Sequence, residues 1–89
     1  MTSSRATIVN RLGLHARAAT QLVHCASAFA AESWITLGER RVNAKSIMGV
    51  LTLAATKGSE VNIEAEGGDA EEAVAAIVAL IQNRFGEEE

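Results

Sequence analysis

The spacing of apolar residues changes repeatedly along this chain and constrains the fold more than any other feature of the sequence. Residues 61–66 alternate between apolar and polar side chains, as a half-buried strand does, and residues 5–9 form a short β-branched run. Between these segments, the apolar residues of 16–30 recur every third or fourth position and so share one helical face. Because one-sided strands and one-sided helices both need a packing partner, the pattern predicts helices packed on a sheet.

The middle of the chain predicts a β-hairpin followed by a short helix. Two candidate strands, 34–37 and 40–43, flank the two-residue connection Gly38-Glu39, and its glycine can take the positive φ that such turns require. Residues 46–54 then form a short helix that is unusually rich in apolar side chains. The hairpin therefore adds two strands to the sheet, and the short segment adds a second helix.

The last third of the chain predicts a third helix. Asp69 stands three residues before Glu72, the spacing of a capping box at a helix start. The apolar residues that follow share one helical face: Val74, Ile77, Val78, Ile81 and Phe85. The complete order is strand, helix, strand, strand, helix, strand, helix. We therefore predict a two-layer α+β sandwich in which the helices cover one face of the sheet.

The length of the chain limits it to one hydrophobic core. A chain of 89 residues is too short for two separate cores, so residues 1–89 predict a single domain. Apolar residues make up 48% of the chain and charged residues 21%, which is typical of a folded protein. The polar ends, residues 1–4 and 86–89, are expected to fray, which leaves an ordered core of about 4–86. We assign no function to either end.

Charge and cysteine content exclude several classes of function. A net charge of −3 and a pI near 5.3 argue against a nucleic-acid partner, although a local basic patch remains possible in the first half. No segment has the ~20 apolar residues of a membrane helix, so no membrane insertion is expected. The single cysteine, Cys25, cannot form an internal disulfide and suits the cytoplasm. Because His15, His24 and Cys25 lack zinc-site spacing, we expect no metal site, and we separately expect no cofactor.

His15 is the strongest candidate for a residue that takes part in a reaction. It directly precedes the first predicted helix, whose unpaired N–H groups and positive dipole end favour phosphate binding. A neutral imidazole at this position can attack phosphorus, and Arg17 could bind the phosphate oxygens with its planar set of donors. No Gly-rich phosphate loop or carboxylate pair accompanies the histidine, which favours a phosphoryl carrier over an enzyme. The alternative is a histidine that serves only as a helix cap or surface residue.

The second predicted helix carries apolar residues on two sides. Helical spacing groups Val50, Leu53 and Ala54 on one side, and Ile47, Met48 and Leu51 on another. One short surface helix cannot bury both groups against its own sheet. The second group therefore predicts an exposed docking surface for protein partners. The alternative is a helix that is buried nearly all round.

Two segments of the sequence resemble the signatures of a known family. Gly13-Leu14-His15-Ala16-Arg17 resembles the active-site segment of HPr proteins of the bacterial phosphotransferase system, and residues 43–50, Asn-Ala-Lys-Ser-Ile-Met-Gly-Val, resemble the second HPr signature. The resemblance covers nearly the whole chain. It implies a βαββαβα open-faced sandwich, with an antiparallel four-stranded sheet of order 1-4-2-3 covered on one face by three helices.

The same resemblance implies a function and its partners. Enzyme I would deliver a phosphoryl group from phosphoenolpyruvate to Nδ1 of His15, and a histidine of an enzyme IIA protein or domain would receive it. Arg17 matches the arginine of the phosphate site. The docking surface would comprise Ala16, Thr20, Gln21, His24, Ile47, Met48 and Leu51. Such a protein is expected to be a cytoplasmic monomer that carries phosphate and is not itself an enzyme.

Some features leave alternatives open. Ser46 resembles the site at which some HPr proteins are phosphorylated by an HPr kinase/phosphorylase, and the alternative is a serine that only caps the second helix. Ala18 occupies a position where many relatives have proline, which leaves open whether the chain serves sugar uptake or a nitrogen-type regulatory branch. A binding or structural module with the same architecture and no covalent chemistry is the alternative from another functional class.

Overall fold

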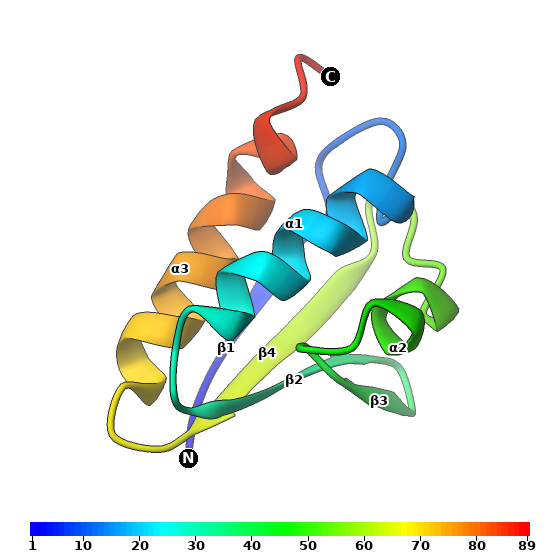
Figure 1. Cartoon of the computed structure of the whole chain (residues 1–89). Helices are drawn as coiled ribbons and strands as arrows, with labels where there is room; N and C mark the ends of the chain where they lie inside the picture. Colours follow the sequence, from blue (N-terminus) through cyan, green and yellow to red (C-terminus); the bar gives the residue numbers. More distant parts are fainter.

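The computed structural model describes residues 1–89, and it contains four strands and three α-helices in the predicted order. The elements are β1 (Thr2–Thr7), α1 (Ala16–Ser27), β2 (Glu32–Leu37), β3 (Arg40–Asn43), α2 (Ile47–Thr52), β4 (Glu60–Glu66), α3 (Ala70–Gln82) and a terminal 3₁₀ turn, η1 (Arg84–Gly86). The strands form one antiparallel sheet of order β1-β4-β2-β3, and the helices lie on one side of it (Figure 1). The α+β sandwich is therefore confirmed.

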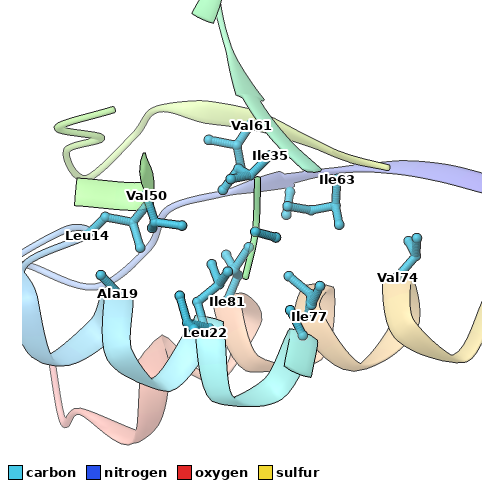
Figure 2. Close-up of a cluster of buried hydrophobic side chains, with 14 of the residues drawn as sticks. Leu14, Ala19, Leu22, Ile35, Val50, Val61, Ile63, Val74, Ile77 and Ile81 are labelled. Atoms are coloured by element: carbon cyan, nitrogen blue, oxygen red, sulfur yellow. The ribbon is translucent and has the colours of Figure 1, made fainter. Parts of the chain in front are cut away.

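The core lies between the sheet and the helices. Val61 and Ile63 of β4 are fully buried, together with Ile35 of the neighbouring strand β2. Leu22 of α1 and Ile77 of α3 face them from the helical layer, as Figure 2 shows. Complete burial of one such aliphatic side chain is worth about 1.5–3 kcal/mol. The alternation in β4 and the apolar faces of the two long helices thus act together in a single core.

The hairpin forms at the predicted position. Leu37 pairs with Arg40, so Gly38 and Glu39 are the two turn residues. Gly38 has a φ of 61°, the left-handed conformation for which glycine is favoured. No helix has the length and apolar content needed to cross a bilayer.

Several element boundaries differ from the sequence prediction: β2 begins at Glu32 instead of residue 34, and α2 runs over Ile47–Thr52 instead of residues 46–54. Strand β1 runs from Thr2 to Thr7 instead of over residues 5–9, because its backbone pairs with β4 starting at Thr2 and Ala65. Backbone pairing does not require apolar side chains, so the polar beginning of the chain is part of the sheet and is not a frayed tail. Helix α1 ends at Ser27 instead of residue 30, because the next two N–H groups bond three residues back and tighten the turn.

The capping box predicted for α3 is wrong. Asp69 occupies the N-cap position but makes no side-chain bond within the helix. Its carboxylate instead accepts hydrogen bonds from the backbone N–H groups of Ala30 (2.9 Å) and Ala31 (2.8 Å). These bonds stabilise the ionised form and hold the pKa of Asp69 below its ordinary value. The residue joins the start of α3 to the segment before β2, a tertiary role that helix spacing cannot reveal.

Candidate functional site

His15 is the N-cap residue of α1, directly at the start of the helix. Its backbone is extended, with φ −73° and ψ 177°, and its side chain is 27% exposed. The side chain makes no capping hydrogen bond, so the interpretation of His15 as a side-chain helix cap is wrong. The imidazole is thus held at the positive end of α1 and is free to use its nitrogens elsewhere.

Gly13 sets the path of the chain into His15. It has a φ of 65°, and a Cβ built on it would lie 2.4 Å from the carbonyl oxygen of Ala55. The next residue, Leu14, donates its backbone N–H to that same oxygen at 2.9 Å. Residues before α1 are therefore packed directly against the loop that follows α2, and only glycine fits at the point of contact.

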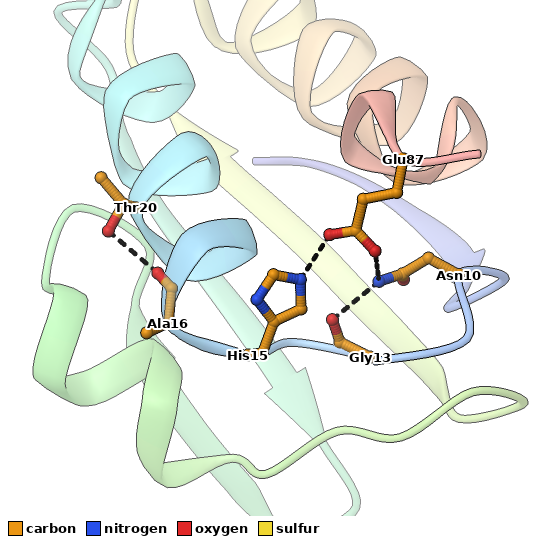
Figure 3. A network of polar contacts seen from close by, with 6 residues as sticks. All are labelled: Asn10, Gly13, His15, Ala16, Thr20 and Glu87. Atoms are coloured by element: carbon orange, nitrogen blue, oxygen red, sulfur yellow. Dashed lines mark hydrogen bonds and ion pairs between the residues drawn. The ribbon is translucent and has the colours of Figure 1, made fainter. Parts of the chain in front are cut away.

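Glu87 and Asn10 complete a polar chain around the histidine (Figure 3). His15 Nε2 contacts Glu87 Oε2, while Glu87 Oε1 accepts a hydrogen bond of 3.0 Å from Asn10 Nδ2. Asn10 is fully buried, and the same Nδ2 donates to the carbonyl of Gly13 at 2.8 Å. Hydrogen bonds from His15 and Asn10 lower the pKa of Glu87, with a smaller contribution from the charge of Arg17.

The end of the chain therefore belongs to the site, which corrects the prediction that residues 86–89 fray without a function. Helix α3 stops at Gln82, so Phe85 is in the 3₁₀ turn and not on the helical stripe, although it is buried. Arg84 and Phe85 both have positive φ, 56° and 53°, and this reverses the chain toward His15. A further ion pair joins Arg11 Nε to Glu89 Oε2 at 2.8 Å.

Sequence reasoning missed both Asn10 and Glu87. Asn10 offered a weak signal, since an asparagine between a predicted strand and a predicted helix often organises the connecting turn. Glu87 offered none, because it is one of three consecutive glutamates and only the fold distinguishes them.

Arg17 lies in the first turn of α1, beside His15. Its side chain is exposed and forms no hydrogen bond or ion pair with another residue. His15 and Arg17 line a surface hollow of about 270 Å³ whose other walls are Arg11, Leu12 and residues 87–89. The structure thus brings the two predicted residues together and leaves the guanidinium available to an anion.

The predicted docking residues lie on two neighbouring helices. Helix α2 packs against α1. The α1 residues are mostly on the surface: Gln21 is half-buried, and the exposed ones are Ala16, Thr20 and His24. On α2, Ile47 is 40% exposed, Met48 is 72% exposed and Leu51 is half-buried. Val50 and Leu53 are buried, so α2 does present one apolar side to water and is not buried all round. Ala54 does not join the buried side: it lies beyond the end of the helix, is exposed, and has a φ of 49°.

Ser46 caps α2. Its Oγ accepts a hydrogen bond of 3.1 Å from the backbone N–H of Gly49, which confirms the capping role. The residue is half-buried and immediately precedes the exposed Ile47 and Met48.

A family model described as the phosphorylation site of the phosphotransferase-system HPr component matches residues 2–83. The chain belongs to the HPr family. The phosphocarrier protein HPr of Neisseria meningitidis is 49% identical over 82 residues, and that of Cupriavidus necator is 52% identical over 83 residues; these matches cover 92% and 93% of both chains, respectively. A crystal structure of HPr from Thermoanaerobacter tengcongensis has a TM-score of 0.96 at 45% identity and covers both chains fully.

Membership of the HPr family makes this chain a phosphocarrier of the phosphotransferase system, not a catalyst, and implies enzyme I and enzyme IIA as partners. A phosphocarrier protein NPr from Shewanella violacea is also 46% identical over 81 residues, covering 91% of this chain and 89% of the relative. The sugar and nitrogen branches are therefore both compatible with the chain. A second Thermoanaerobacter tengcongensis structure, described as an HPr dimer, has a TM-score of 0.78 at 45% identity and covers 98% of this chain and 100% of the other.

Proposed function

We propose that this phosphocarrier accepts its phosphoryl group from enzyme I on Nδ1 of His15 and transfers it to a histidine of enzyme IIA. The observation that carries the proposal is the occupation of the other ring nitrogen: Nε2 contacts Glu87. Figure 3 shows Nδ1 on the far side of the ring, directed toward the start of α1. A phosphoryl group attached there would lie near the helix N-terminus, where anions are stabilised.

Arg17 and the first N–H groups of α1 are suited to hold the phosphoryl oxygens. The guanidinium is exposed beside His15 and can turn toward the group with two parallel donors. The N–H groups of the first turn have no partner within the helix. Ala18 adds one such N–H that a proline would lack, so we expect this departure from many relatives to leave transfer intact.

The two histidines allow a matched test of the acceptor. His15→Ala and His24→Ala are each incubated with phosphoenolpyruvate and enzyme I, and intact mass is measured before and after acid treatment. We expect the wild type and His24→Ala to gain one acid-labile phosphate and His15→Ala to gain none. Labelling of His15→Ala at wild-type stoichiometry would show that the acceptor lies elsewhere.

We also propose that the exposed side of α2, with its neighbours on α1, binds enzyme I and enzyme IIA. Met48 is 72% exposed, so aspartate there adds charge to a contact surface without entering the core. Met48→Asp should weaken enzyme I binding about tenfold or more in calorimetry, whereas Val9→Asp, at an exposed apolar residue in the β1–α1 connection, should not. Equal affinities for Met48→Asp and wild type would place Met48 outside the interface.

Phosphorylation of Ser46 by an HPr kinase/phosphorylase is a proposal for regulation. Phosphate would place nearly two negative charges beside Ile47 and Met48, and its oxygens would meet the free N–H groups of α2. Ser46→Asp should keep the fold, since aspartate is also a good N-cap, and should accept phosphate from enzyme I more slowly. The deficit should shrink as salt screens the added charge. Equal quench-flow rates for Ser46→Asp and wild type at low salt would leave Ser46 as a cap alone.

The remaining proposals concern the oligomeric state of the protein, its location in the cell and the branch that it serves. We propose a monomer that works in the cytoplasm, where its free Cys25 stays reduced. Light scattering after size exclusion tests the monomer, and a mass of two chains at micromolar concentration would reject it. Transfer assays with purified sugar-type and nitrogen-type enzyme IIA proteins would assign the branch.

A further inference from the structure

The carboxylate of Glu87 is held in a defined orientation beside His15. It uses Oε2 to contact His15 Nε2 and Oε1 to accept the bond from Asn10, so both oxygens are engaged. Asn10 is itself fully buried and bonded to the carbonyl of Gly13, which leads directly into the histidine. The imidazole and the carboxylate are 27% and 22% exposed, so water screens this contact less than an ordinary surface ion pair.

The approach of Glu87 is built into the backbone and is not the result of a loose tail. Phe85 anchors the segment in the core, and the positive φ values of Arg84, Phe85 and Gly86 turn the chain back over the site. The ion pair between Arg11 and Glu89 holds the segment beyond Glu87. Residues with strained backbone persist only where the surrounding structure requires them, and here they bring one carboxylate to one histidine.

We propose that Glu87 is a positioning residue for phosphoryl transfer at His15. It keeps the ring proton on Nε2, which leaves the lone pair on Nδ1, and it fixes the ring plane so that this lone pair points toward the start of α1. The tautomer of a histidine is set by the hydrogen bond that its other nitrogen makes. The inference rests on the proposed role of His15 as the phosphoryl acceptor.

The transfer step also gives the carboxylate an electrostatic role. As the Nδ1–P bond forms, the bond between phosphorus and the enzyme I donor breaks, and its electron pair returns to the donor. His15 keeps its Nε2 proton, so its ring acquires a positive charge that was absent before attack. Glu87 lies across the ring from the new bond and stabilises that charge, as the acidic member of a catalytic triad does for its histidine. The carboxylate is ionised at neutral pH, because its pKa lies below the ordinary 4.5 through the hydrogen bonds from His15 and Asn10.

Two substitutions at Glu87 separate position from charge. Glu87→Gln retains an oxygen that can accept the Nε2–H bond but removes the charge, and Glu87→Ala removes both. Glu71→Gln, on the exposed surface of α3, is the control for the same change in net charge. Both positions lie outside the core, and heteronuclear NMR spectra would verify the fold of each variant.

The readouts are the ¹⁵N shifts of the His15 ring, which report the tautomer, and the single-turnover rate of phosphorylation by enzyme I. We expect wild type and Glu71→Gln to hold His15 as the Nε2–H form. Glu87→Ala should populate both neutral forms and slow transfer roughly 10-fold. Glu87→Gln should largely keep the tautomer but still slow transfer by several fold, because it cannot stabilise the ring charge.

An unchanged tautomer and an unchanged rate in Glu87→Ala would overturn the proposal. A faster rate would also overturn it, since Glu87 would then be a barrier to phosphate and not an aid. These failures differ from failure of the proposed function. If His15 were not the acceptor, His15→Ala would still be labelled, whatever the behaviour of the Glu87 variants.

Discussion

Replacing Gly13 with alanine tests whether the contact behind His15 determines the geometry of the site. The new Cβ would lie 2.4 Å from Ala55 O and 3.0 Å from the Cα of Thr56, both of them backbone atoms that cannot rotate away. Relief requires the two segments to separate. Separation breaks the 2.9 Å hydrogen bond from Leu14 N to Ala55 O and displaces the residue that follows, His15.

Two contributions set the expected loss in the free energy of unfolding. A side chain in the left-handed region costs about 1–2 kcal/mol. Loss of a backbone hydrogen bond at a buried contact adds about 1–2 kcal/mol. Gly13→Ala should therefore lower the free energy of unfolding by roughly 2–4 kcal/mol, which for a domain of this size lowers the melting temperature by roughly 10–25 °C.

Gly38 supplies the control, because it has a similar φ of 61° but no atom within 4 Å of the position that a Cβ would take. Gly38→Ala should show only the conformational cost of about 1–2 kcal/mol. Urea unfolding of both variants measures the difference, and phosphorylation by enzyme I well below the melting temperature measures the effect on His15. Equal destabilisation of the two variants, or a normal rate for a destabilised Gly13→Ala, would refute the reasoning.

Three further predictions concern stability. Ala54→Gly should raise the free energy of unfolding by about 0.5–1 kcal/mol in urea titrations, because alanine at φ 49° is strained and exposed; a decrease would mean that the loop has relieved the strain. In thermal melts, Ser46→Ala should lose about 1 kcal/mol of stability through loss of the 3.1 Å bond to Gly49 N, and Ser46→Asp should stay close to wild type. In the folded protein the pKa of Asp69 lies below its ordinary value of 3.8. The ionised carboxylate therefore stabilises the fold fully above pH 3.8, and this stabilisation is lost as the pH falls through the folded pKa. Asp69→Asn should show a shallower loss of stability than wild type in urea titrations below pH 3.8, and identical pH profiles would contradict this role.

The sequence by itself determined the sheet and helix layers of the fold and the position of the candidate functional residues. The alternation through Val61 and Ile63 identifies the buried face of β4, and the position of Gly38 identifies the hairpin turn. Both signals are local, because a strand period or a turn conformation depends on neighbouring residues alone. His15 was likewise found from its place directly before a helix, and Arg17 from its place in the first turn of that helix.

Only the tertiary structure decided which groups surround the histidine and which carboxylates have partners. The carboxylate of Asp69 was expected to cap its own helix, yet it bonds to N–H groups 38 and 39 residues away. Glu87 lies 72 residues from His15 along the chain, and nothing in three consecutive glutamates shows which one reaches the imidazole. Hydrophobic spacing specifies the face that an element buries, whereas contacts between distant residues depend on how the packed elements and their strained turns bring chain segments together.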